Sequence, residues 1–188
     1  MFMRKEKPNY FILTGAMGSG KTTLCTVLQA KGVQISPEAT RQILIEQRSF
    51  DGNSVIERDP KLFVELALSR MIHTYQEYDS DSQKGPIVFD RGVPDMLAYS
   101  EFLNIEAQFV QRAAQIYGYN KTVFMMADWP EIYTTDSERT IPYEEAKAFG
   151  ARLRRIYQGL GYILVEVPPM TVEERAEFLL EQINSALK

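Results

Sequence analysis

The chain has 188 residues, of which 45% are hydrophobic and 24% charged, and its formal net charge is -4 at pH 7. This composition is ordinary for a globular protein and excludes a disordered or fibrous class. The negative charge argues against nucleic acid as the main partner. No segment approaches the ~20 apolar residues of a membrane-spanning helix. We therefore expect one cytoplasmic domain over residues 1–188 with no nucleic-acid or membrane partner.

The first predicted elements flank a glycine-rich loop. Residues 10–14 form a short apolar run with high β-propensity, and Leu24, Val27 and Leu28 then recur at helical spacing. Between them, residues 15–23 read Gly-Ala-Met-Gly-Ser-Gly-Lys-Thr-Thr, which fits the pattern G-x-x-x-x-G-K-[ST] of a phosphate-binding P-loop. Strand, loop and helix follow in the order that this motif requires, which argues against a chance glycine-rich turn.

The spacing of the loop has a chemical reason. Backbone N–H groups wrap a polyphosphate only where no Cβ blocks close approach, which explains the glycines at 15, 18 and 20. Lys21 is placed to reach the β- and γ-phosphates, and the Thr22 hydroxyl to ligate Mg²⁺. We expect ATP, with GTP as the alternative, because no N-K-x-D guanine-recognition motif follows a strand. The predicted nucleotide contacts are Gly15, Ala16, Met17, Gly18, Ser19, Gly20, Lys21, Thr22 and Thr23.

Strands and helices alternate through the rest of the chain. Further strands are predicted over residues 33–35, 86–90, 122–126 and 162–165. Helices are predicted over 39–48, from an Asp59-Pro60 N-cap past residue 75, over 95–102, 106–117 and 144–158, and after a Thr171-x-x-Glu174 capping box. Alternation of this kind predicts an α/β fold with a parallel, doubly wound sheet, in which ligands bind at the carboxyl ends of the strands.

Asp90 and Arg91 follow the strand predicted over residues 86–90. A carboxylate at a strand end is what a P-loop protein needs to hold Mg²⁺, and Arg91 is placed to pair with phosphate. The alternative is a carboxylate that only caps the helix after it.

Glu38 and Arg41 lie three residues apart where the second predicted strand meets a helix, so they share a helix face. Two interpretations are open. One is a surface salt bridge worth about 0–1 kcal/mol. The other is a carboxylate that accepts the proton of a substrate hydroxyl, beside a guanidinium that holds phosphate or substrate.

The polar segment 128–142 carries Arg139, which is placed to close over a triphosphate as part of a lid. Arg152, Arg154 and Arg155 on the next helix fit that role or a solvated helix face equally well. Trp129 is expected to pack in the core.

With these motifs the chain resembles the P-loop kinases of nucleosides and nucleoside monophosphates. It is most similar to a group of predicted ATPases related to nicotinamide riboside kinases. The resemblance rests on residues 15–23, Glu38-Ala39-Thr40-Arg41, residues 89–95, and residues 129–136 with Arg139. Gly92 departs from the pattern, because deoxynucleoside kinases usually have Ser or Tyr there.

The resemblance implies a five-stranded parallel sheet in the order 2-3-1-4-5. It also implies Glu38 as base or substrate anchor, Asp90 and Arg91 as assistants to Mg²⁺ and phosphate, and Arg139 as the lid arginine. Together with Lys21, these are the predicted catalytic residues, and Thr22 and Asp90 are the predicted metal ligands. Weaker candidates for the acceptor pocket are Arg41, Phe63, Arg70, Asp95 and Tyr99.

We therefore expect a kinase that transfers phosphate from ATP to a nucleoside, a nucleotide or a similar small metabolite, as a monomer or a homodimer. The alternative is a regulatory ATP- or GTP-binding NTPase, in which segments 50–58 and 128–142 act as switches for a protein partner.

Overall fold

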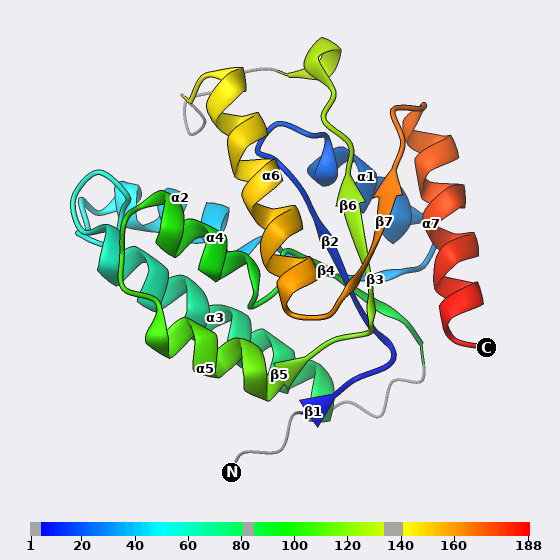
Figure 1. Ribbon diagram of the computed structural model, residues 1–188, viewed down its shortest axis with the longest axis horizontal. Helices are drawn as coiled ribbons and strands as arrows, with labels where there is room; N and C mark the ends of the chain where they lie inside the picture. The colour runs from blue at the N-terminus through cyan, green and yellow to red at the C-terminus, as the bar shows by residue number, and fades with distance from the viewer. Residues whose placement is uncertain (1–4, 81–84, 134–140) are drawn as a thin grey trace.

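A central parallel sheet lies between two layers of helices in the computed structural model, which describes residues 5–80, 85–133 and 141–188 (Figure 1). Helices α1 (Lys21–Ala30) and α7 (Val172–Ala186) cover one face. The other face is covered by α2 (Ala39–Ser49), α3 (Pro60–Ser80), α4 (Asp95–Phe102), α5 (Gln108–Ile116) and α6 (Tyr143–Gly159). A short 3-10 helix, η1 (Pro130–Ile132), follows the fourth strand of the sheet.

The main sheet has five parallel strands in the order β3-β4-β2-β6-β7. They are β2 (Tyr10–Thr14), β3 (Gln34–Ser36), β4 (Ile87–Asp90), β6 (Thr122–Met126) and β7 (Ile163–Val167). Counted along the chain, these strands have the spatial order 2-3-1-4-5, which confirms the expected topology.

Differences from the sequence prediction are small and lie at element ends. Strand β3, predicted over residues 33–35, begins one residue later than predicted. Strand β7, predicted over residues 162–165, ends two residues later. Strands β1 (Lys5–Glu6) and β5 (Tyr117–Gly118) form a separate two-stranded parallel sheet that was not predicted. Two-residue strands carry no periodicity from which they could be recognised.

Two apolar cores fill the spaces between the sheet and its helices. Because side chains alternate along a strand, Tyr10 and Ile12 of β2 belong to the core under α2–α6, whereas Phe11 and Leu13 belong to the core under α1 and α7. All four are at most 2% exposed. This two-sided burial explains why the sequence of β2 is an unbroken apolar run.

Asp59 caps the start of helix α3 as predicted, because its carboxylate accepts a hydrogen bond from the backbone N–H of Leu62 at 2.9 Å. Its inner face is buried, from Phe63 at 0% exposure to Tyr75 at 0%. Leu62, in contrast, is 41% exposed and lies outside this face.

The fold brings the ends of three strands together. Strand β2 ends at Thr14 and enters the P-loop, β3 ends at Ser36 just before Glu38, and β4 ends on Asp90. Since β3, β4 and β2 are adjacent and parallel, these three ends lie at the same edge of the sheet. Among the described residues, no helix is both long and apolar enough to cross a bilayer.

Helix α7 starts with the predicted capping box, which offers a direct test of the assigned helix boundary. The Thr171 hydroxyl accepts from the backbone N–H of Glu174 at 3.3 Å, and the Glu174 carboxylate accepts from the backbone N–H of Thr171 at 2.9 Å.

Thr171→Ala should lower the free energy of unfolding by about 1 kcal/mol in urea titrations. Thr26→Ala is the matched control, because its exposed hydroxyl donates only to the carbonyl of Thr22 within α1. It should change stability by less than about 0.5 kcal/mol. Equal effects of the two substitutions would contradict the capping role.

Candidate active site

The glycine-rich loop has backbone conformations that favour glycine. Gly18 has φ 76° and Gly20 has φ 81°, both in the left-handed region. Gly15 has φ 149°, and a Cβ added there would lie 2.7 Å from Cβ of Met126. Gly20 directly precedes α1, so the N–H groups of the first turn face the concave side of the loop. This arrangement is suited to binding an anion at a helix N-terminus.

Lys21 folds back over the loop, where its Nζ donates to the carbonyl oxygens of Ala16 at 3.2 Å and Gly15 at 3.4 Å. A cavity of about 360 Å³ lies in front of the loop. It is lined by residues 18–23 of the loop and first turn together with Arg41, Ile132 and Arg175. Ile132 and Arg175 were not predicted to line this cavity, because they lie more than 100 residues away from the loop in sequence, and neither side chain is itself part of a phosphate-binding motif.

Arg91 is buried behind the loop, with a side chain that is 1% exposed. Its Nε donates to Oε1 of Glu38 at 3.1 Å, and its Nη1 donates to the Gly15 carbonyl at 3.1 Å and to Oδ1 of Asp95 at 3.0 Å. The residue has φ 71°, which is uncommon for a non-glycine residue and is typical of constrained sites. The guanidinium is therefore directed into the protein and not toward the cavity in which phosphate was expected to meet it.

Glu38 keeps one carboxylate oxygen for a ligand. Its Oε1 accepts from Arg91 and, at 2.9 Å, from the Thr40 hydroxyl, whereas Oε2 has no hydrogen bond within the described residues. Burial alone would raise the pKa of Glu38, but Arg91 and Lys21 outweigh burial and lower it to about 2. Glu38 is thus ionised at neutral pH, and a base of this strength has little tendency to take up a proton. The geometry suits a hydrogen-bond acceptor that orients a hydroxyl group.

Asp90 and Thr22 face a common cavity of about 240 Å³, which Glu38 and Arg41 also line. Asp90 is 5% exposed, and its Oδ1 has no partner in the part of the chain that the structure describes. Burial, and then the charge of Glu38, raise the pKa of Asp90 to about 6. Helix α4 has no side-chain cap, so the alternative role of Asp90 as a helix cap has no support.

An oxygen donor set of this kind fits Mg²⁺, which prefers one or two carboxylates together with water and phosphate oxygens. The orphaned oxygen of Asp90 is the observation that supports the fit, because a buried carboxylate oxygen without a partner is costly. The described residues contain no cluster of three or more acidic, His or Cys side chains suited to a metal. A metal bound here would therefore need ligands from a nucleotide.

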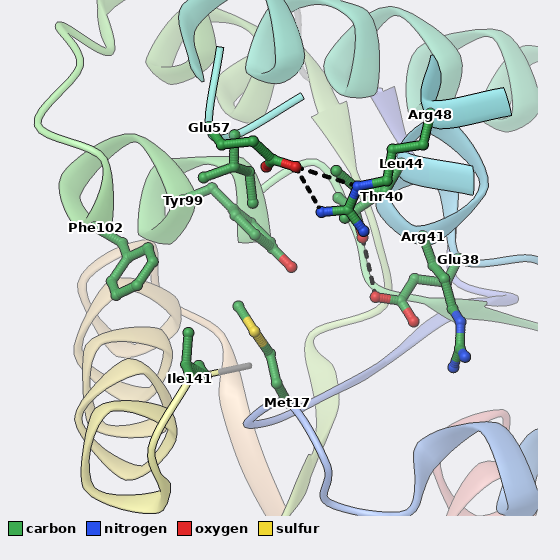
Figure 2. Close-up of a pocket in the computed structure, with 11 residues that line it drawn as sticks. Met17, Glu38, Thr40, Arg41, Leu44, Arg48, Glu57, Tyr99, Phe102 and Ile141 are labelled. Carbon is green, nitrogen blue, oxygen red and sulfur yellow. Dashed lines mark hydrogen bonds and ion pairs between the residues drawn. The ribbon is translucent and has the colours of Figure 1, made fainter. Parts of the chain in front are cut away.

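A second cavity, of about 140 Å³, lies beside Glu38 (Figure 2). Its apolar lining consists of Met17, Leu44, Ile56, Tyr99, Phe102 and Ile141, and its polar lining of Glu38, Thr40, Arg41, Arg48 and Glu57. In Figure 2, the side chain of Met17 from the P-loop and the hydroxyl group of Tyr99 point into this cavity. Arg48 donates to Oε1 of Glu57 from Nη2 at 2.8 Å and from Nε at 3.2 Å.

Arg41 connects the cavities, because it lines the space in front of the P-loop as well as this second one. Thr40, Leu44 and Arg48 were missed at the sequence level. Their spacing of four residues on α2 is a usable signal, since it places them on one helix face.

The structure does not bring every predicted pocket residue to this cavity. Phe63 is 0% exposed and lies beneath Tyr99, with ring centroids 6.0 Å apart. Arg70 pairs with Glu46 at 3.0 Å on the outer side of α2. Asp95 is 0% exposed and accepts from Thr14 at 2.6 Å, Arg91 at 3.0 Å, the backbone N–H of Gly92 at 3.0 Å, and the Tyr157 hydroxyl. Asp95 therefore anchors the start of α4 and has no oxygen left for a substrate.

Gly92, the departure from the deoxynucleoside kinase pattern, has a packing reason. A Cβ at this position would lie 2.4 Å from Cδ1 of Ile12, so a larger residue would require the buried Ile12 side chain or the turn after β4 to move.

The predicted lid arginine, Arg139, lies outside the described residues. On α6, Arg152 and Arg155 pair with Glu101, and Arg154 pairs with Glu166 at 3.0 Å. Arg154 also pairs at 3.5 Å with Asp128, which is the first residue of the predicted lid segment.

Trp129 does not pack in the core as expected. It is partly exposed and, with Ala16 to Ser19, lines a small hollow beside the P-loop.

Comparison with known proteins supports the same fold. The sequence family described as an AAA domain matches residues 10–175. No curated protein matches the chain in sequence. Deoxyadenosine kinase from M. mycoides, solved with dCMP and dCDP, superposes with a TM-score of 0.62 at 14% identity over 94% of this chain and 99% of that one.

Two further solved structures share the architecture. The NadR protein in complex with NR gives a TM-score of 0.67 at 15% identity; the match covers 98% of this chain but only 51% of that protein. Shikimate kinase from Aquifex aeolicus gives 0.55 at 18% identity over 94% and 96% of the two chains. At these identities the likeness establishes the fold, which is that of the P-loop kinases.

The buried position of Arg91 leads to a stability prediction. Arg91→Met leaves Glu38 and Asp95 as buried carboxylates without their cation, which should cost about 3–5 kcal/mol of unfolding free energy in urea at pH 7. Arg70→Met is the matched control and should cost about 0–1 kcal/mol, because the Arg70–Glu46 pair is solvent-exposed. If Arg91→Met costs no more than this control, the buried network does not hold the loop as described.

Proposed function

The chain belongs to the AAA-domain family, and from this membership and its kinase fold we propose that it is a small-molecule kinase. In this proposal it transfers the γ-phosphoryl group of ATP, bound with Mg²⁺, to a hydroxyl group of a nucleoside or a nucleoside-like metabolite. Its relatives in structure act on different acceptors, so the fold alone names none.

The observation that carries the proposal is the adjacency of the two cavities at Arg41, with Glu38 in the lining of the second. The cavity in front of the P-loop is sized and lined for a polyphosphate, and Arg41 borders both it and the cavity under Tyr99. A regulatory NTPase needs the first cavity alone. A kinase needs both, because its acceptor hydroxyl must lie in line with the transferred group.

Each predicted residue of the phosphate cavity has a role in this reaction. Backbone N–H groups of residues 15–23 would bind the β-phosphate, and Lys21 would leave the loop carbonyls for the β- and γ-phosphates. Thr22 and Asp90 would hold Mg²⁺, which neutralises charge on the transferred phosphoryl group. Arg139 in the lid would add a second positive charge as the site closes.

Glu38 would orient the acceptor, since its free Oε2 lies beside the acceptor cavity and its low pKa keeps it ionised. Phosphoryl transfer requires little proton transfer before the transition state, so positioning suffices. Arg91 would act through Glu38 and the P-loop by fixing their relative positions, and would not itself bind phosphate.

The lining of the acceptor cavity suggests a small, flat molecule with a hydroxyl group at one end. Tyr99 and Phe102 supply aromatic surface, while Leu44 and Ile56 supply apolar walls. Arg48 and Glu57, paired at the polar rim, offer a donor and an acceptor that suit the edge of a heterocycle.

A screen for acceptor-dependent ADP release tests the proposal against its rival. Nucleosides, nucleoside monophosphates and other hydroxylated metabolites are added singly to the protein with Mg²⁺ and ATP. A kinase should show release stimulated at least about 100-fold by one compound, because a positioned acceptor replaces water. Slow release that no metabolite stimulates, but that a protein partner changes, would favour the regulatory NTPase with switch segments 50–58 and 128–142.

Glu38→Gln tests the role of the carboxylate. The amide oxygen can still accept from Arg91, so we expect the fold and nucleotide affinity to be retained. The loss of charge should lower acceptor-stimulated turnover by about 100-fold. Glu46→Gln is the control, because Glu46 lies on the same helix but pairs outward with Arg70. Full turnover in Glu38→Gln with the identified acceptor would remove Glu38 from the mechanism.

A further inference from the structure

Arg175 is a basic side chain at the phosphate cavity that no motif predicted. It lies in the first turn of α7, is only 6% exposed, and lines the cavity together with the P-loop. A Cβ added at Gly20 would come within 3.1 Å of its Nη1, so the guanidinium lies directly against the loop. Its Cζ lies 5.2 Å from the ring centroid of Trp129, which is a cation–π contact.

Among the described residues, no acceptor or carboxylate pairs with the guanidinium of Arg175. Neither Nε nor Nη1 donates a hydrogen bond to any residue within 5–80, 85–133 and 141–188, although both atoms are buried. No carboxylate in those ranges forms an ion pair with it, and burial lowers its pKa. The nearby acid in its own turn, Glu174, is instead hydrogen-bonded to Thr171. Burying a guanidinium without hydrogen-bond acceptors costs free energy, unless a ligand supplies those acceptors.

The arrangement indicates what kind of ligand would do so. Arginine presents its N–H groups as a planar fork that matches the oxygens of a phosphate group. The cavity that Arg175 faces is lined by the anion-binding backbone of residues 18–23, with Arg41 as a further cation. An anionic oxygen in this space would meet donors from α1, α2 and α7 together.

We propose that Arg175 is a phosphate ligand, which binds the polyphosphate chain of the nucleotide from the α7 side of the P-loop. The inference rests on the proposed nucleotide binding. It assigns to α7 a contact that holds the donor nucleotide independently of the lid, and it gives Trp129 the role of positioning that contact.

The test compares binding of Mg²⁺–ATP and of inorganic tripolyphosphate, which has phosphates but no base or sugar. Affinities are measured by calorimetry, with the emission of Trp129, the single tryptophan, as a second readout. Arg175→Met should weaken both ligands by a similar factor of about 10–100, because each loses the same charge-assisted hydrogen bonds. Arg112→Met, which removes an exposed arginine on α5, is the control and should leave both affinities unchanged.

Stability without ligand separates this role from a structural one. Since the guanidinium forms no hydrogen bond from Nε or Nη1 and no ion pair with the described residues, Arg175→Met should melt at the same temperature as the wild type or higher, while its nucleotide-induced shift becomes smaller. If Arg175→Met does not fold, the arginine is structural and the proposal fails, unless Arg175→Gln folds and shows the same loss for both ligands.

Three other results would overturn the proposal. Unchanged tripolyphosphate affinity in Arg175→Met would remove the phosphate contact. Weaker ATP binding with unchanged tripolyphosphate binding would assign Arg175 to the nucleobase. A wild type that binds neither ligand would refute nucleotide binding itself, and this inference with it.

Discussion

The guanidinium of Arg91 joins the three segments on which the candidate site depends. It bonds to the carbonyl of Gly15 in the P-loop, to Glu38 after β3, and to Asp95 at the start of α4. Few positions of the surrounding segments are compatible with this buried cation, because the loss of any partner leaves a buried charge uncompensated. The backbone of Arg91 adopts an uncommon conformation with positive φ, and this conformation accompanies the inward direction of the side chain. This network fixes where the P-loop stands relative to the cavity that Glu38 and Tyr99 line.

The parallel sheet supplies the frame in which this network can form. Strands β3, β4 and β2 are neighbours, so the residues that follow them meet at one edge although they lie far apart in sequence. The same edge gathers a low-pKa carboxylate at Glu38 and a raised-pKa carboxylate at Asp90. Their environments differ because Arg91 bonds directly to Glu38, whereas Oδ1 of Asp90 is buried with no hydrogen-bond partner among the described residues. In the proposed reaction these environments suit two tasks: orientation of a neutral hydroxyl group, and binding of a cation.

Sequence patterns predicted the elements and the P-loop because both depend on local chemistry. Glycines with positive φ and apolar strands buried on both sides leave signatures within a few residues. The strand order came from the resemblance, and the topology confirms it. The inward direction of Arg91 could not be read from the sequence, because it depends on contacts with Gly15 and Glu38 across 76 and 53 positions. The spacing of Arg175 from Leu179 places it on the buried face of α7, but its position at the phosphate cavity depends on packing between α7 and the loop, which the sequence does not show.

The central claim is that Arg91 holds the P-loop and Glu38 in place and is not itself a phosphate ligand. A crystal structure with Mg²⁺ and a non-hydrolysable ATP analogue tests this most directly. The account predicts phosphate oxygens on the backbone of residues 15–23, with Arg91 still bonded to Glu38, Asp95 and the Gly15 carbonyl. An Arg91 side chain turned out of this network, with its guanidinium on the β- or γ-phosphate, would contradict it.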